Sequence, residues 1–167
     1  MKTVLYMAMT ANGYIAKAND DTPWSATEWR SYYSTVKKFK AIIIGSRTYD
    51  IMLRQGEFKK IKNRIIVVAE EKKQSYKNFL FVSSPREALR VARKLGCKSV
   101  LLGGGGATNG AFMKQGLVDE IILDIEPLVF GSGIKLFGDS DFEKQLQLFS
   151  AKKLSKNTMQ LKYKVKK

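Results

Sequence analysis

Short apolar runs alternate along the chain with segments that carry helix-start signals. Continuous apolar runs of strand length occur at residues 3–9, 41–45, 64–69, 79–82 and 99–102, and a further strand is expected over residues 118–126. Runs of this kind, without polar alternation, are typical of strands that are buried on both faces. The pattern therefore predicts a three-layer α/β/α fold, in which helices cover both faces of a mixed, mostly parallel sheet.

Capping residues mark the ends of the expected helices. Ser25-Ala26-Thr27-Glu28 has the capping-box spacing and predicts a helix over about residues 26–38. Ser84-Pro85-Arg86-Glu87 repeats the signal with proline at the first helical position, and Gly96 ends that helix near Leu95. Shorter helices are expected over residues 47–53 and 107–115.

The C-terminal part of the chain predicts an antiparallel hairpin instead of a further crossover. Residues 145–154 and 158–165 flank a turn signal at Lys156-Asn157. The sequence shows neither an internal repeat nor a linker, so residues 1–167 are expected to form one domain.

Composition excludes several kinds of chemistry. The 167 residues contain no histidine and a single cysteine, Cys97. A Ser-His-Asp triad, a Cys-His pair, a His-ligated zinc site and a zinc deaminase centre are therefore excluded, and no metal site is expected. The apolar runs are too short to span a bilayer, no signal peptide precedes the first strand, and the lone cysteine suits a reducing compartment. We expect a cytoplasmic protein without a membrane partner.

The formal net charge of +15 raises the question of nucleic-acid binding. The lysines are scattered along the chain, and no nucleic-acid motif accompanies them. We therefore expect solvated faces and a general attraction of anions, with a true polyanion patch as the alternative. Phosphate groups of a dinucleotide would profit from such a field.

Two strand-to-helix junctions have the features of phosphate sites. Gly103-Gly104-Gly105-Gly106 follows one expected strand and opens a helix, so backbone N–H groups can approach an anion closely. The glycine spacing is not that of a Rossmann motif. Gly45-Ser46-Arg47-Thr48 offers a second such junction, with a guanidinium and two hydroxyls. The alternative to phosphate binding is that the glycines at these junctions allow each helix to pack tightly against the sheet.

With these motifs, the chain resembles the dihydrofolate-reductase-like superfamily, which includes the riboflavin-pathway pyrimidine reductase domain. The resemblance covers nearly the whole chain. It is carried by Ala11 to Ala16, Pro23-Trp24, Gly45 to Tyr49, Gly103 to Gly106, and Gly116 to Glu120 leading to Pro127 and Gly131-Ser132-Gly133. The last block is most similar to the pyrimidine reductases, whereas Pro23-Trp24 is more similar to dihydrofolate reductases.

The resemblance implies an NADPH-dependent hydride transfer, with NADH as a possible substitute. It implies that Ala8, Ile15, Ala16 and Leu102 contact the nicotinamide. It further implies that the phosphates are bound by the two glycine-containing junctions, at Gly45, Ser46, Arg47, Thr48, Gly103, Gly104, Gly105, Gly106, Ala107 and Thr108. The substrate, a pterin or pyrimidine, is expected to contact Met7, Trp24, Trp29 and Tyr33.

Two carboxylates are candidates for the catalytic acid. Glu28 is nearest to the position of the pterin-binding carboxylate in dihydrofolate reductases, but its capping-box spacing could instead turn it toward Ser25. Asp124 interrupts an apolar strand, where an unpaired carboxylate would be costly, unless it faces solvent at a sheet edge.

Ala69-Glu70-Glu71 occupies the position where the resemblance implies hydroxyl and basic side chains that bind the adenosine 2′-phosphate. Carboxylates there favour a ribose hydroxyl, and hence NADH, although Lys72, Lys73 and Arg47 could compensate.

Three functions follow. The first is reduction of dihydrofolate to tetrahydrofolate. The second is reduction of the riboflavin-pathway ribosylaminopyrimidine, a branch in which homodimers are common. The third is a non-catalytic nucleotide- or RNA-binding protein.

Overall fold

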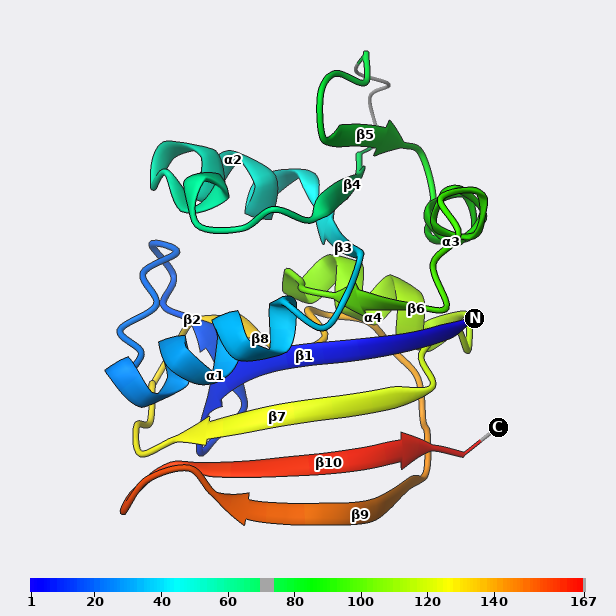
Figure 1. The fold of residues 1–167 in the computed structure, drawn as a ribbon. Coiled ribbons are helices and arrows are strands. Elements are labelled where there is room, and N and C mark those ends of the chain that lie inside the picture. The colour runs from blue at the N-terminus through cyan, green and yellow to red at the C-terminus, as the bar shows by residue number, and fades with distance from the viewer. Residues whose placement is uncertain (70–73, 167) are drawn as a thin grey trace.

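The computed structural model describes residues 1–69 and 74–166, and Figure 1 shows their arrangement. Eight strands form one sheet, in the order β5-β4-β3-β6-β1-β7-β10-β9. The strands of this sheet are β1 (Lys2–Thr10), β3 (Ala41–Gly45), β4 (Arg64–Val68), β5 (Phe79–Val82), β6 (Ser99–Leu102), β7 (Glu120–Glu126), β9 (Leu146–Lys153) and β10 (Met159–Val165). The helices are α1 (Ala26–Val36), α2 (Ser46–Arg54), α3 (Pro85–Lys94) and α4 (Gly106–Lys114), with a short 3-10 turn, η1 (Glu57–Lys59).

The sheet is parallel from β5 to β7 and antiparallel beyond β7. The first strand lies in its interior, where Val4 pairs with Leu101 of β6 on one side and Glu120 of β7 on the other. β10 pairs antiparallel with both β7 and β9. The predicted mixed sheet with a C-terminal hairpin is confirmed.

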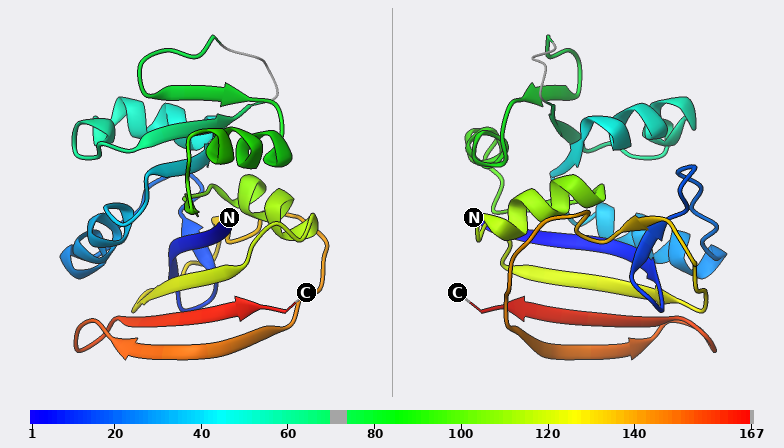
Figure 2. Two further views of the ribbon diagram at one scale, coloured as in Figure 1. Left: turned by 45° about the vertical axis from the view of Figure 1, so that its right-hand side comes forward. Right: turned by 180° about the vertical axis from the view of Figure 1, so that it is seen from behind.

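The helices lie in two layers, one on each face of the sheet, as the two views of Figure 2 show. Successive side chains of β1 point alternately into two hydrophobic cores, one on each face of the sheet. Val4 and Tyr6 belong to the cluster that also contains Val36 of α1 and Tyr49 of α2. Leu5, which points to the opposite face, belongs to the cluster of α3 and α4. The period-2 alternation of strands thus produces the predicted three layers.

The predicted elements agree with the structure within a few residues at their ends. Ser84 caps α3 through the amide of Glu87, and Gly96 follows the helix with a positive φ of 71°. Three short elements were not predicted: η1 and the two strands β2 (Tyr14–Ala16) and β8 (Ile134–Lys135), which pair antiparallel. Two or three residues are too few to show a periodicity.

The open edge of the sheet is β9. It exposes Leu146, Leu148 and Phe149, of which Leu148 is 52% exposed. Within the described residues, no helix is both long enough and apolar enough to span a membrane.

Candidate active site

A cavity of about 890 Å³ opens where β1, β3 and β6 end. Its residues follow the strand order: Val68 and Ala69 at the end of β4, Gly45 to Thr48 where β3 leads into α2, Gly103 and Gly105 to Thr108 after β6, then Met7 and Ala8 of β1. Further walls come from α1 and from the far half of α2. Ligands of open α/β sheets bind at this carboxyl edge, and the volume suits a small-molecule site.

Two helices begin at this cavity without a side chain that caps them. Their N-cap residues are Gly45 for α2 and Gly105 for α4, and neither helix start receives a side-chain hydrogen bond. The first N–H groups of both helices therefore remain available, and together with the positive ends of the helix dipoles they favour an anion.

Glycine is required at the start of α4 for space. A Cβ added to Gly106 would overlap the carbonyl oxygen of Lys135 and lie 3.0 Å from the amide nitrogen of Gly138. The backbone that follows β8 therefore packs directly on the first turn of α4. Gly103, Gly105, Gly106, Ala107 and Thr108 all line the cavity.

The other residues expected to hold a cofactor divide into two sets. Ala8, Ile15, Ala16, Gly45, Ser46, Arg47 and Thr48 line the cavity. Leu102 and Gly104 do not. Leu102 is fully buried in the core, and the carbonyl of Gly104 accepts a hydrogen bond from the amide of Gly45 at 2.8 Å. The cofactor contacts expected at these two residues stay predictions.

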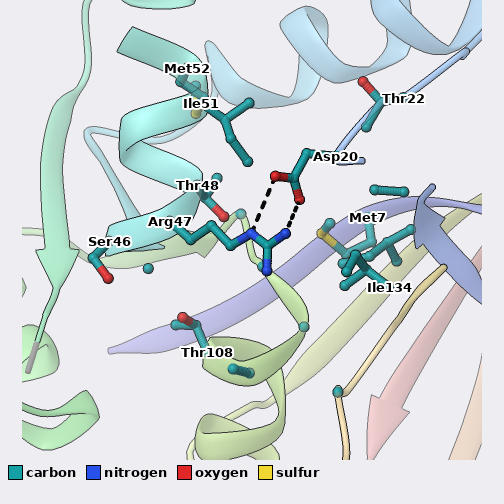
Figure 3. A pocket seen from close by; sticks show the side chains of 18 of the residues that line it. Met7, Asp20, Thr22, Ser46, Arg47, Thr48, Ile51, Met52, Thr108 and Ile134 are labelled. Atoms are coloured by element: carbon teal, nitrogen blue, oxygen red, sulfur yellow. Dashed lines mark hydrogen bonds and ion pairs between the residues drawn. The ribbon is translucent and has the colours of Figure 1, made fainter. Parts of the chain in front are cut away.

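Arg47 is paired across the cavity with Asp20, which lies in the segment between β2 and α1 (Figure 3). Its Nη2 lies 2.8 Å from Asp20 Oδ1, and its Nε donates to Oδ2 at 3.3 Å. The Arg47 side chain is largely exposed, so water weakens this pair. A phosphate in the cavity could therefore compete with Asp20 for the guanidinium.

Aromatic side chains form the end of the cavity beneath α1. Trp24, Trp29 and Tyr32 line it, and the ring centroids of Trp29 and Tyr32 lie 6.0 Å apart in an edge-to-face arrangement. Tyr33, the tyrosine expected here, does not line the cavity. It lies one residue, or about 100°, further round the helix, and its hydroxyl donates to Glu57 of η1.

Beneath these rings, Tyr6 connects two buried carboxylates. Its Oη lies 3.0 Å from Glu28 Oε1 and 2.7 Å from Asp124 Oδ2. Asp124 Oδ1 accepts a further hydrogen bond from Gln160 Nε2 at 2.9 Å. Glu28 Oε2 is buried without a partner among the described residues, and Glu28 lines the cavity. An unpartnered buried oxygen in the wall of a cavity is a candidate contact for a ligand.

The capping box of α1 is formed only in part, which explains why Glu28 faces inward. Ser25 Oγ accepts from the Glu28 amide at 3.2 Å, as the spacing predicts. The reciprocal bond comes instead from Glu126, whose Oε2 accepts from the Ser25 amide at 2.8 Å. Because Glu126 satisfies the helix start, the Glu28 carboxyl is free to reach Tyr6.

Asp124 is fully buried and does not line the cavity. It lies on β7 in the interior of the sheet, not at a solvent-facing edge. Its side chain reaches the cavity only through Tyr6. Asp124 is thus linked to Glu28 and to the cavity by hydrogen bonds through Tyr6.

Burial raises the pKa of Glu28 from its ordinary value of 4.5 to about 8, opposed by the hydrogen bond from Tyr6 and assisted by the charges of Asp124 and Glu126. The Tyr6 hydroxyl has one proton but faces two carboxyl oxygens. A protonated Glu28 relieves this, because the hydroxyl then has one charged neighbour, Asp124, instead of two. Burial also raises the pKa of Tyr6, so Tyr6 stays neutral.

Three residues of the hydrogen-bonded groups described here were not predicted from the sequence: Tyr6, Asp20 and Glu126. Of these, Tyr6 had a readable signal, because it shares a face of the first strand with Ala8. Among the described residues, no group of three or more Cys, Asp or Glu side chains is arranged to hold a metal ion.

Residues 52–160 match the family model described as the RibD C-terminal domain. Among curated proteins, the uncharacterized protein YwjB of Bacillus subtilis is 28% identical over 173 residues, with 97% of each chain covered.

Three solved structures share the fold. A putative riboflavin biosynthesis protein from Shewanella sp. PV-4 is 17% identical, with a TM-score of 0.85 and full coverage of both chains. A diaminohydroxyphosphoribosylaminopyrimidine deaminase/5-amino-6-(5-phosphoribosylamino)uracil reductase from Thermotoga maritima is 17% identical with a TM-score of 0.76, and the alignment covers 98% of this chain but 56% of that one. Dihydrofolate reductase from Enterococcus faecalis, complexed with NADP(H), is 16% identical with a TM-score of 0.68, over 99% of this chain and 97% of that one.

Proposed function

The chain belongs to the RibD C-terminal domain family, within the dihydrofolate-reductase-like fold, and we propose that it is an NADPH-dependent reductase of a pyrimidine-type ring system. One observation carries this proposal. Two uncapped helix starts and a buried, protonated carboxyl face the same cavity, one suited to a dinucleotide and the other to a ring nitrogen.

The cavity fits a nicotinamide dinucleotide. The starts of α2 and α4 supply backbone N–H groups for a pyrophosphate, and Thr48 and Thr108 add hydroxyls beside them. Ala8, Ile15 and Ala16 offer a small apolar surface for the nicotinamide at the end of β1. When bound there, NADPH supplies the hydride. Glu70 and Glu71, which disfavour a 2′-phosphate, and Lys72 and Lys73, which could compensate, lie outside the described residues. The choice of NADPH over NADH therefore stays a prediction.

The residues of this chain supply orientation and the proton. A hydride that arrives at a C=N carbon leaves the nitrogen basic, and the protonated Glu28 donates its proton to that nitrogen. Asp124 and Tyr6 hold Glu28 in place through the hydrogen bonds described above. The aromatic side chains and the cover of the segment that carries Asp20 limit the access of water to the ring.

The comparisons favour a pyrimidine over dihydrofolate as the ring. The matching family model is that of the RibD C-terminal domain, and the TM-score is higher for the riboflavin-pathway structures than for the dihydrofolate reductase. Dihydrofolate, the first expectation from the sequence, is therefore kept as the comparison substrate in the assay.

We expect the purified protein to oxidise NADPH, measured at 340 nm, when 5-amino-6-ribosylaminouracil or its 5′-phosphate is present. NADH and dihydrofolate serve as the parallel cofactor and substrate. If dihydrofolate is reduced and the uracil compounds are not, the protein is a dihydrofolate reductase, as first expected from the sequence. Absence of binding of either dinucleotide, together with salt-dependent RNA binding, would replace the reductase with the nucleic-acid-binding alternative.

Arg47 is expected to contribute to dinucleotide binding, and its ion pair with Asp20 is expected to weaken this contribution. Arg47→Ala should raise the KM for NADPH about 10-fold, because a charge-assisted hydrogen bond to phosphate is lost. Asp20→Asn should instead leave this KM unchanged or lower it, because the guanidinium is released. Arg54→Ala, an exposed residue of the same helix that does not line the cavity, is the control. Equal losses in the Arg47 and Asp20 variants would show that their pair organises the site.

The exposed apolar residues of β9 are compatible with the homodimer expected from the sequence. They are Leu146, Leu148 and Phe149, on the open edge of the sheet. The dimer stays a prediction.

A further inference from the structure

We infer that the ring bound in this cavity carries no phosphate or other anionic tail: the substrate is a flat amino-heterocycle whose remainder is neutral or cationic. This inference rests on the proposed function and narrows its substrate class. It departs from the phosphoribosyl compound named for the Thermotoga maritima structure.

The charges that line the cavity are the first argument. Apart from the protonated Glu28, four of its described residues are acidic and one is basic, in a chain whose net charge is +15. The acidic residues are Asp20, Asp50, Glu57 and Asp139, and the basic one is Arg47. A cavity that is acidic inside a basic protein disfavours an anionic ligand locally, whatever the long-range field.

The single basic residue belongs to the dinucleotide end. Arg47 stands at the start of α2 beside Ser46 and Thr48, where the phosphates of the cofactor are expected. The ring end is lined by α1, by the far half of α2 and by Glu57, and no lysine or arginine of the described chain lines it. Lys60, which lies outside the cavity lining, is held by Glu57 at 2.7 Å.

Helix ends also disfavour a phosphate at the ring end. Met52 and Gln55 come from the last turn and C-cap of α2, where free carbonyl groups and the negative end of the helix dipole are found. The start of α1 could attract an anion, but Glu126 already accepts from the Ser25 amide at 2.8 Å. The ring end therefore contains no free anion-binding group comparable to the two at the dinucleotide end.

The unpartnered oxygen of Glu28 is the second, independent argument. Glu28 is 2% exposed, and its Oε2 lacks a hydrogen-bond partner among the described residues. A ring nitrogen that accepts from the protonated carboxyl would satisfy it, and Trp29 and Tyr32 provide flat walls beside it. The recognised features are thus a planar ring and its nitrogen, not a charge on a tail.

Two matched pairs of ligands test the inference. One pair is 5-amino-6-(5-phosphoribosylamino)uracil and the same compound after phosphatase treatment. The other is dihydrofolate, with its dicarboxylate tail, and 7,8-dihydropterin, which has none. The kcat/KM for NADPH oxidation should be about 10-fold or more higher for the tail-free member of each pair.

Binding provides a readout that does not need turnover. The chain has two tryptophans, Trp24 and Trp29, and both line the cavity, so quenching of their fluorescence reports ring binding directly. The tail-free members should again bind about 10-fold more tightly.

A charge reversal at the ring end supplies the matched variant. Asp50→Lys should raise the affinity for the phosphorylated uracil about 10-fold and change that for the dephosphorylated compound less than about two-fold. Glu143→Lys makes the same change in net charge at an exposed residue that does not line the cavity, and it should alter neither.

A phosphorylated uracil that binds more tightly than its dephosphorylated form would overturn the inference, while turnover of either compound would leave the proposed reductase standing. If neither pair is reduced, the proposed function fails, and the fluorescence comparison still decides whether the ring end rejects anions.

Discussion

Replacement of Glu28 by glutamine is expected to lower kcat by about 10²- to 10³-fold, while NADPH affinity stays unchanged. Glutamine preserves the shape of the protonated carboxyl and can still contact Tyr6, but it has no proton to give to the ring nitrogen. General acid catalysis contributes a factor of this size. The uncapped starts of α2 and α4 lie at the other end of the cavity and are untouched by the change.

The pH profile distinguishes this role from a structural one. Because the pKa of Glu28 is raised to about 8, the acid is protonated at neutral pH and deprotonates above that value. The kcat/KM of the unmodified protein should therefore fall about 10-fold per pH unit above pH 8, and the Glu28→Gln variant should lose this limb. Asp124→Asn, which alters only the residue behind Tyr6, should cost about 10-fold and retain the limb. A limb that disappears in the Asp124 variant and persists in the Glu28 variant would contradict the assignment.

The Glu28→Gln substitution lowers activity but should increase the stability of the fold relative to the unmodified protein as the pH rises. A carboxyl whose pKa is higher in the folded than in the unfolded protein stabilises the fold fully below the unfolded value, here 4.5, and this contribution is lost as the pH rises to about 8. Glutamine does not ionise. The melting temperature of Glu28→Gln relative to the unmodified protein should therefore rise between pH 5 and pH 8.5, in a thermal melt at both pH values. A constant difference would show that Glu28 is not protonated in the fold.

Gly106→Ala is expected to lower the melting temperature by about 5 °C and to weaken NADPH binding at least about 10-fold. The added methyl would overlap the carbonyl oxygen of Lys135 and crowd the Gly138 amide. Overpacking against backbone, which cannot rotate away, typically costs 1–3 kcal/mol. The first turn of α4 must then shift, and with it the N–H groups at the phosphate end of the cavity.

Gly131→Ala is the matched control for this change. A Cβ at Gly131 would meet nothing within 4 Å, and the residue is exposed. Thermal melts and dinucleotide titration should therefore be unchanged in this variant. If Gly106→Ala binds NADPH with normal affinity, the start of α4 is not the phosphate site.

The fold could be predicted to a large extent because its main signals are local. Uninterrupted apolar runs mark β3, β5 and β6 at their observed bounds, and Ser84 with Gly96 marks the ends of α3. Neither β2 nor β8 is stable alone, since each depends on the other, 118 residues or more apart in the chain, and nothing local identifies such a pair.

The site was harder to predict because its geometry depends on partners distant in sequence. The orientation of Glu28 depends on Glu126, which takes over the capping bond at Ser25. The choice between Tyr32 and Tyr33 depends on where Glu57 sits, because Glu57 draws Tyr33 away from the ring end. Residue spacing identifies the helix and its capping motif but contains neither of these contacts.

The interior position of β1 has a consequence for how the chain folds. Among the described residues, β1 pairs with β6 and β7, so Lys2 must meet Ser99 and Val4 must meet Glu120, which lie far along the chain. Contacts of such long sequence separation slow folding, because a large loop must close before either pairing forms. The middle of the sheet is consequently completed late in folding, and the apolar run of β1 remains unpaired until then.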